Sequence, residues 1–273
     1  MRRHITFQCE GDTLAGTLDD AAGSAGLLIV SGGNEIRSGA HGGQAQLAQH
    51  FARAGHPVFR YDRRGIGDSE GENGEFENSA EDIAAAAATF RKEAPHVARI
   101  IAFGNCDAAT ALALFQVGLP IDTLILANPW VIEQEASGEA DEEAPTTPSA
   151  AAIRARYWAR IKNPRSIIDL FSGKINLRKL LGGLAKASQR EEASGLAVRL
   201  AKALGGTDWP VQILLAKRDT TALAFYAAWK DAIFEAARSR ENIRLTEYDS
   251  ASHSFADAGA KAWLKAQIGD MLK

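Results

Sequence analysis

The chain has 273 residues, of which 46% are hydrophobic and 24% are charged, and this balance is typical of a compact globular protein. Disorder and fibrous repeats are therefore excluded. The 31 Lys and Arg residues against 34 Asp and Glu residues leave a net charge of −3. The chain has no overall positive field for binding nucleic acid, so a nucleic-acid partner is not expected.

The N-terminus is basic but is followed by no apolar segment of signal-peptide length, and nowhere do 18 apolar residues run uninterrupted. We therefore expect a cytoplasmic protein with no membrane span. The two cysteines, Cys9 and Cys106, lie in unrelated local sequences, so a structural disulfide is not expected in a reducing compartment.

The first half of the chain predicts a hairpin followed by alternating strands and helices. Residues 3–18 alternate apolar and polar around a Gly-Asp turn, which predicts an antiparallel hairpin. Residues 26–30 form a continuous apolar run, typical of a strand buried on both faces of a parallel sheet, and end in a glycine-rich loop. The next predicted elements are helices over 44–54, 79–94 and 108–117 and strands over 57–61, 99–103 and 123–127.

The composition changes over 131–208, where an acidic segment is followed by helical segments rich in Arg and Lys, and we predict an inserted helical cap there. Residues 1–130 and 209–273 are predicted to form the core. Their alternation indicates an α/β fold, a mostly parallel twisted sheet with helices on both faces. The predicted elements after the cap are strand 211–216, helix 222–238, strand 242–248 and helix 259–272.

The segment GNCDA at 104–108 is the most specific chemical signal in the chain. Here a strand must turn into a helix within about one residue, which is the geometry of a nucleophile elbow. Cys106 would lie at the mouth of the helix, where the positive end of the helix dipole favours a thiolate. We therefore predict Cys106 as the nucleophile and the backbone N–H of Asp107 as an oxyanion donor.

A nucleophile of this kind needs a base, and the base needs an acid that orients it. Asp219 follows strand 211–216, and His253, which follows strand 242–248, is the only histidine after Cys106. Asp249 is the alternative acid. The order Cys106, Asp219, His253 is the nucleophile, acid, histidine order of the α/β-hydrolase fold.

The chain resembles the α/β-hydrolase superfamily over its whole length apart from the predicted cap. Its segments VSGGNEIRSG at 30–39, YDRRGIGDSEG at 61–71 and GNCDA at 104–108 look more closely like the bacterial hydrolase 1 family associated with the exosortase A system. That resemblance implies a setting in exopolysaccharide production and protein sorting. Where the wider superfamily has Ser at the elbow and His-Gly after the third strand, this chain has Cys106 and Ser31-Gly32.

Two loops are expected to support the elbow. The glycine loop after residue 30 lets a backbone N–H approach an oxyanion, with Gly33 the first choice of donor and Asn34 the second. Residues 62–69 resemble the Asp-x-Arg-Gly-x-Gly-x-Ser segment that braces the elbow in hydrolases, and they lack the helix of a dinucleotide fingerprint. The Asp107 carboxylate either acts on the thiol or a polar substrate group, or simply stabilises the helix N-terminus.

Three further residues are candidate substrate contacts. His41 lies in a glycine-flanked loop, whereas Tyr157 and Trp158 lie in the predicted cap and could equally pack the cap on the core. The Arg and Lys residues of the cap either solvate a helix face or guide an anionic substrate.

We therefore predict a hydrolase that cleaves a small-molecule ester or thioester through an acyl-enzyme. No metal or organic cofactor is expected, because neither metal-site spacing nor a nucleotide motif is present. A thioester intermediate is hydrolysed only if the histidine activates water. Acyl transfer to a sugar or amine is consequently the alternative, and a non-catalytic binding protein of the same fold is a further one.

Overall fold

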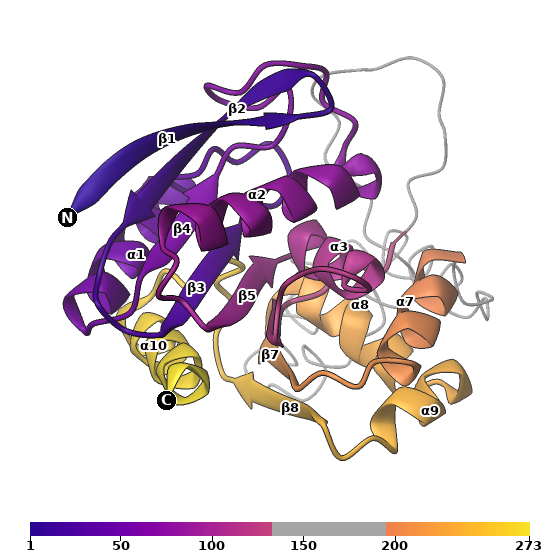
Figure 1. The fold of residues 1–273 in the computed structure, drawn as a ribbon. Coiled ribbons are helices and arrows are strands. Elements are labelled where there is room, and N and C mark those ends of the chain that lie inside the picture. Colours follow the sequence, from indigo (N-terminus) through magenta and orange to yellow (C-terminus); the bar gives the residue numbers. More distant parts are fainter. Residues whose placement is uncertain (133–194) are drawn as a thin grey trace, which may run out of the picture.

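The structure is a computed structural model that describes residues 1–132 and 195–273. The strands of its sheet are β1 (Arg2–Cys9), β2 (Asp12–Asp19), β3 (Ala25–Val30), β4 (Val58–Tyr61), β5 (Arg99–Asn105), β6 (Thr123–Ala127), β7 (Val211–Ala216) and β8 (Ile243–Tyr248). They lie in the order β1-β2-β4-β3-β5-β6-β7-β8, and Figure 1 labels each of them except β6. β2 pairs antiparallel with β1 and with β4, and the other neighbouring pairs are parallel. The predicted hairpin and the mostly parallel sheet are confirmed.

Helices cover both faces of the sheet (Figure 1). Their bounds are α1 (Gly43–Arg53), α2 (Ala80–Glu93), α3 (Asp107–Phe115), α7 (Gly195–Gly205), α8 (Thr220–Trp229), α9 (Glu235–Arg238) and α10 (Ala258–Leu272), with short 3₁₀ turns η1 (Ala40–Gly42), η2 (Phe76–Asn78) and η3 (Ala232–Phe234). The prediction of one helix over 222–238 is wrong. The chain breaks after α8, because the side chain of Asp231 accepts a hydrogen bond from the Ile233 N–H and starts a new turn.

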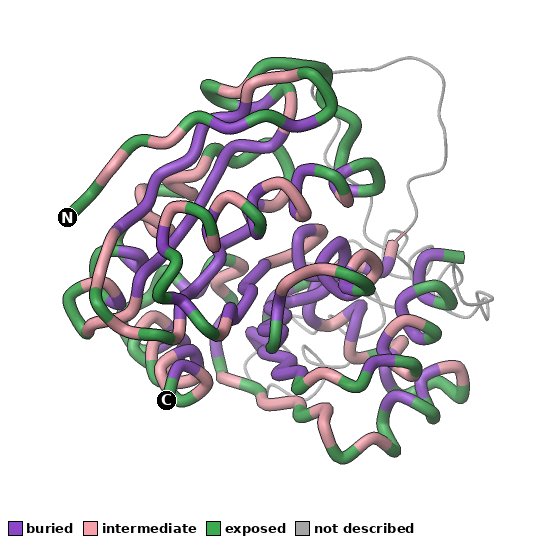
Figure 2. The backbone as a smooth tube through the Cα atoms, viewed as in Figure 1, coloured by how far each residue is buried: buried purple, intermediate pink, exposed green. Residues whose placement is uncertain are grey.

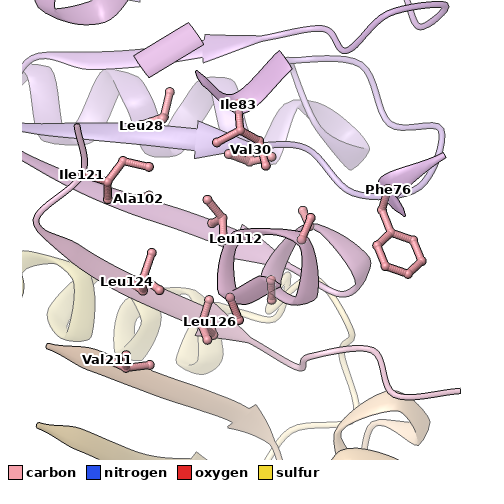
Figure 3. Close-up of a cluster of buried hydrophobic side chains, with 14 of the residues drawn as sticks. Leu28, Val30, Phe76, Ile83, Ala102, Leu112, Ile121, Leu124, Leu126 and Val211 are labelled. Atoms are coloured by element: carbon pink, nitrogen blue, oxygen red, sulfur yellow. The ribbon is translucent and has the colours of Figure 1, made fainter. Parts of the chain in front are cut away.

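The apolar residues of the central strands belong to two hydrophobic clusters, one on each face of the sheet. In β3, Leu28 and Val30 pack with α2 and α3, whereas Leu27 and Ile29 pack with α1 and α10. Figure 3 shows part of the first cluster, and Figure 2 shows that the buried backbone follows the central strands. The uninterrupted apolar run of β3 therefore reflects burial on both faces.

One helix of the predicted insertion belongs to the main core. Helix α7 packs against α3 and α9, and its apolar face is buried in the same cluster as α2 and α3. Its apolar residues recur at helical spacing, which aligns them on the face turned to the core. Among the described residues, no helix is long and apolar enough to cross a membrane.

Candidate active site

The connection from β5 to α3 is a tight turn centred on Cys106. The backbone of Cys106 has φ 63° and ψ −128°, a combination that non-glycine residues rarely adopt. Gly104 permits the turn, since a Cβ atom there would lie 2.7 Å from the carbonyl carbon of Ala108 in α3. The Cys106 N–H donates to the Ala127 carbonyl at 3.0 Å, and the Cys106 carbonyl accepts from the Trp130 N–H at 3.2 Å. The strained elbow is thus held at both its backbone groups by the last residue of β6 and the chain that follows it.

Asp219 is placed by the start of α8. It is the N-cap of that helix, where its Oδ2 accepts a hydrogen bond from the Ala222 N–H at 3.0 Å. Only 6% of Asp219 is exposed. The same Oδ2 accepts a hydrogen bond from His253 Nδ1 at 3.0 Å. The helix cap therefore fixes the carboxylate that orients the imidazole.

His253 joins Asp219 to Cys106. Hydrogen bonds to the side chains of Asp219 and Cys106 raise the pKa of His253 to about 10, although its burial acts in the opposite direction. The imidazole is therefore protonated at neutral pH. Because Nδ1 bonds Asp219, Nε2 is the ring atom left for Cys106.

The structure brings together the three residues that the sequence singles out, Cys106, Asp219 and His253. The alternative acid, Asp249, lies apart from them. Its side chain is 77% exposed and pairs with the guanidinium of Arg218 at 2.8 Å. Asp249 thus belongs to a surface ion pair.

The loop after β3 lies directly against the elbow. Gly32 allows this approach, because a Cβ atom there would lie 2.7 Å from the Asn105 carbonyl oxygen and 2.4 Å from Asp107 Oδ1. The Gly33 N–H, the first choice of oxyanion donor, donates to the Asp107 carboxylate, with 2.8 Å to Oδ1 and 2.9 Å to Oδ2. Asn34 accepts a hydrogen bond from the Asn73 amide at 2.9 Å through its side chain. The Asp107 carboxylate therefore binds the N–H that the sequence predicts as an oxyanion donor.

The backbone N–H of Asp107 is the second predicted oxyanion donor. Asp107 is the first residue of α3, so its N–H has no acceptor within the helix. The Ala108 N–H, one residue further, donates to Asp107 Oδ1 at 2.9 Å. The Asp107 side chain thus contacts both the helix N-terminus and the facing loop, as an anion at a helix N-terminus does.

Residues 62–69 hold the glycine loop in place. Arg63, which is buried, donates to the Gly33 carbonyl. The buried Asp62 accepts from both the backbone and the side chain of Arg37, and the same guanidinium pairs with Asp68 at 2.7 Å. These hydrogen bonds run to the glycine loop. The segment therefore holds this loop, which in turn lies against the elbow.

Glu35 is a second carboxylate at the site, which the sequence analysis did not single out. Burial raises its pKa, and its charge interacts with those of His253 and Asp107. The Gln44 amide donates to Glu35 Oε2 at 3.3 Å and accepts from Ser31 Oγ at 2.8 Å. Its position in the loop after a central parallel strand is the only sequence signal that could have indicated it.

The remaining predicted substrate contacts are less defined. His41 is exposed in η1, in the left-handed region with φ 52°, and its carbonyl accepts from the Gln46 amide at 3.3 Å. Tyr157 and Trp158 lie outside the described residues. Within residues 1–132 and 195–273, no group of three His, Cys, Asp or Glu side chains could hold a metal ion.

Comparisons with known proteins bear on the family and the fold of the chain. A family model described as serine aminopeptidase S33, Hydrolase_4, matches residues 24–257. An esterase from Pyrococcus furiosus superposes with a TM-score of 0.64 at 14% identity, covering 100% of this chain and 90% of its own. The α/β hydrolase GrgF from Penicillium sp. sh18 has a TM-score of 0.60 at 17% identity, covering 100% and 98%. The thioesterase domain from the curacin biosynthetic pathway has a TM-score of 0.58 at 14% identity, covering 98% and 99%. No curated protein matches the sequence.

Proposed function

Since this chain belongs to the serine aminopeptidase S33 family, Hydrolase_4, we propose that it is a hydrolase of esters or thioesters with Cys106 as its nucleophile. The α/β-hydrolase fold predicted from the sequence is confirmed by the family match and by the similar structures. The observation that supports the chemistry is His253, which hydrogen-bonds both Asp219 and the thiol at a strained elbow. In this arrangement the base, His253, contacts the nucleophile on one side and the acid on the other.

Acylation starts when the proton of the hydrogen bond between Cys106 and His253 lies on Nε2, which leaves the sulfur as a thiolate. The thiolate forms a bond to the carbonyl carbon, and the electron pair of the C=O double bond moves to the oxygen. Collapse of this oxyanion breaks the bond to the alkoxide or thiolate leaving group, which takes the proton from Nε2 of His253. The product is an acyl thioester on Cys106 and an alcohol or thiol.

Hydrolysis of the acyl-enzyme requires His253 to act as a base. Acylation removes the hydrogen bond and the charge of Cys106, which both raise the pKa of His253, so its pKa falls when the thioester forms. The neutral imidazole then takes a proton from water, and the hydroxide attacks the thioester carbonyl. Collapse expels the Cys106 thiolate, releases the carboxylic acid and leaves the proton on His253 as at the start.

The oxyanion hole opens only when the Asp107 carboxylate moves. The N–H of Asp107 is available at the start of α3, whereas the N–H of Gly33 is bound by the Asp107 side chain. We therefore expect the substrate carbonyl oxygen to replace this carboxylate at Gly33 during acylation.

The biological setting belongs to the same proposal. The resemblance of residues 30–39, 61–71 and 104–108 to hydrolase 1 of the exosortase A system supports a role beside exopolysaccharide production and protein sorting. Acyl groups esterified to sugars are the substrates that such a setting suggests. A panel of acylated monosaccharides, assayed for release of free acid, tests this choice against simple alkyl esters.

The test of the chemistry is intact-mass spectrometry after brief exposure to p-nitrophenyl esters and acyl thioesters. An acyl adduct is expected on the wild type and on His253→Ala, where it should persist longer because water is not activated, but not on Cys106→Ala. Adding a sugar or amine acceptor distinguishes the alternative, since a transferase adduct would be discharged faster by the acceptor than by water. Absence of any Cys106 adduct with every donor would refute the proposal and favour a binding protein.

A further inference from the structure

Asn128 is a strained and fully buried residue at the carboxyl end of β6. Its backbone has φ 41°, in the left-handed region, and its exposed fraction is 0%. Its N–H donates to the Leu214 carbonyl at 2.9 Å, which continues the pairing of β6 with β7. Asn tolerates this conformation better than most residues, yet a strained buried polar residue persists only where its surroundings require it.

The side chain of Asn128 makes three hydrogen bonds. Its Oδ1 accepts from the Ala216 N–H at 2.8 Å. Its Nδ2 donates to Asn105 Oδ1 at 3.2 Å and to the His253 carbonyl at 2.9 Å. One acceptor and two donors are thus engaged, and both N–H bonds of the amide are used.

Each of these contacts reaches an element that carries one residue of the triad. Asn105 directly precedes Cys106 at the elbow. Ala216 ends β7, and its carbonyl accepts from the Asp219 N–H at 2.8 Å, so it forms the turn that presents the acid. The third partner is the backbone of His253 itself.

We propose that Asn128 is a positioning residue that fixes the segments of Cys106, Asp219 and His253 relative to one another. This inference rests on the proposed function for its catalytic consequence. The chain around Asn128 has the same role, since Ala127 and Trp130 bind the two backbone groups of Cys106. The triad is therefore assembled around the end of β6, although β6 itself supplies none of its three side chains.

Two substitutions separate the contacts of Asn128. Asn128→Asp keeps the size and the acceptor for the Ala216 N–H, but places a carboxylate oxygen where the amide donated to the carbonyl of His253. Asn128→Leu removes all three hydrogen bonds. A displacement of the reacting groups by about 1 Å costs about 10²-fold in rate. We expect the acylation rate with p-nitrophenyl acetate to fall about 10- to 100-fold in both variants, with KM changed less than about twofold.

Gln116 provides a matched control at the far end of α3. Its buried amide also makes three hydrogen bonds, donating to the Ala113 and Ala203 carbonyls and accepting from the Thr207 hydroxyl. Gln116→Leu should lower the melting temperature as Asn128→Leu does, but should leave acylation unchanged. Equal loss of acylation in Gln116→Leu, or normal acylation in a folded Asn128→Asp, would overturn the proposal.

A readout that needs no substrate keeps this test separate from the proposed function. Alkylation of Cys106 by iodoacetamide, followed by intact mass, measures how readily the sulfur reacts beside His253. The buried Cys9, whose pKa is raised to about 12 by burial and by Asp82, serves as an unreactive internal control. Cys106 should be alkylated at least about fivefold more slowly in Asn128→Asp than in the wild type, even if the wild type cleaves no ester.

Asn105→Ala removes a single contact and covers the case in which the Asn128 variants do not fold. It should also slow Cys106 alkylation, but by a smaller factor than Asn128→Asp, because the hydrogen bonds of Asn128 to His253 and Ala216 remain. An unchanged alkylation rate in Asn105→Ala together with unfolded Asn128 variants would assign Asn128 to stability alone and refute the positioning role.

Discussion

Replacing Asp107 with alanine should speed the acylation of Cys106. The Asp107 carboxylate accepts the Gly33 N–H at 2.8 and 2.9 Å, and in the proposed mechanism the substrate oxyanion displaces it. A hydrogen bond to a charged group contributes about 1.5–3 kcal/mol, and the lower figure applies because Gly33 is exposed. Removing that competition lowers the barrier by about 1.5 kcal/mol, which corresponds to about tenfold in rate.

The glycine loop should stay in place in Asp107→Ala, because Arg63 still donates to the Gly33 carbonyl. Asp107→Asn retains a neutral acceptor oxygen and should therefore show a smaller increase. Glu81→Ala is the matched control, since Glu81 is also a first-turn carboxylate, in α2, but it pairs with Arg64 away from the elbow. Its acylation rate should equal that of the wild type.

The assay is stopped-flow measurement of the p-nitrophenolate burst with p-nitrophenyl acetate at saturating concentration. The burst rate reports acylation before the thioester is hydrolysed. A tenfold slower burst in a folded Asp107→Ala variant would refute the reasoning, because it would mean that the carboxylate assists the oxyanion loop and does not compete with the substrate.

Three further predictions concern the histidine and the glycine loop. Because the folded-state pKa of His253 is raised from 6.5 to about 10, its contribution to stability is fully present below about pH 6.5 and is lost as pH rises through about 10. Urea unfolding should therefore show a larger decrease in the free energy of unfolding between pH 7 and 10.5 in the wild type than in His253→Gln. Equal decreases in the two proteins would contradict this. Asp219→Asn removes the largest cause of the raised pKa, so the imidazole titration of His253 followed by NMR should move toward 6.5 and kcat should fall about 10³–10⁴-fold; an unmoved titration would count against the assigned hydrogen bond. Arg63→Met removes the anchor of the Gly33 carbonyl and should lower kcat about 10- to 100-fold with little change in KM, an expectation that wild-type kcat in the folded variant would disprove.

Local sequence patterns were sufficient to predict the α/β fold and its strands, although not the break in the chain after α8. The apolar run of β3 indicated burial on both faces because a strand between two helical layers needs apolar side chains at every position. The GNCDA segment indicated an elbow because the glycine and alanine leave room for a helix to start against a strand. Asp219 and His253 could be found by their order and by their positions after strands, because the carboxyl ends of parallel strands meet at one edge.

The contacts that tune the site were decided by the tertiary structure. The Gly33 N–H meets the Asp107 carboxylate across 74 positions in the chain, and Asn128 meets the His253 carbonyl across 125. Such hydrogen bonds depend on where two loops end in space, and they leave no periodicity in either segment. The sequence by itself therefore predicted which residues meet at the elbow. Only the packing of the sheet decided which backbone N–H binds the Asp107 carboxylate and which amide is hydrogen-bonded to the segments of Cys106, Asp219 and His253.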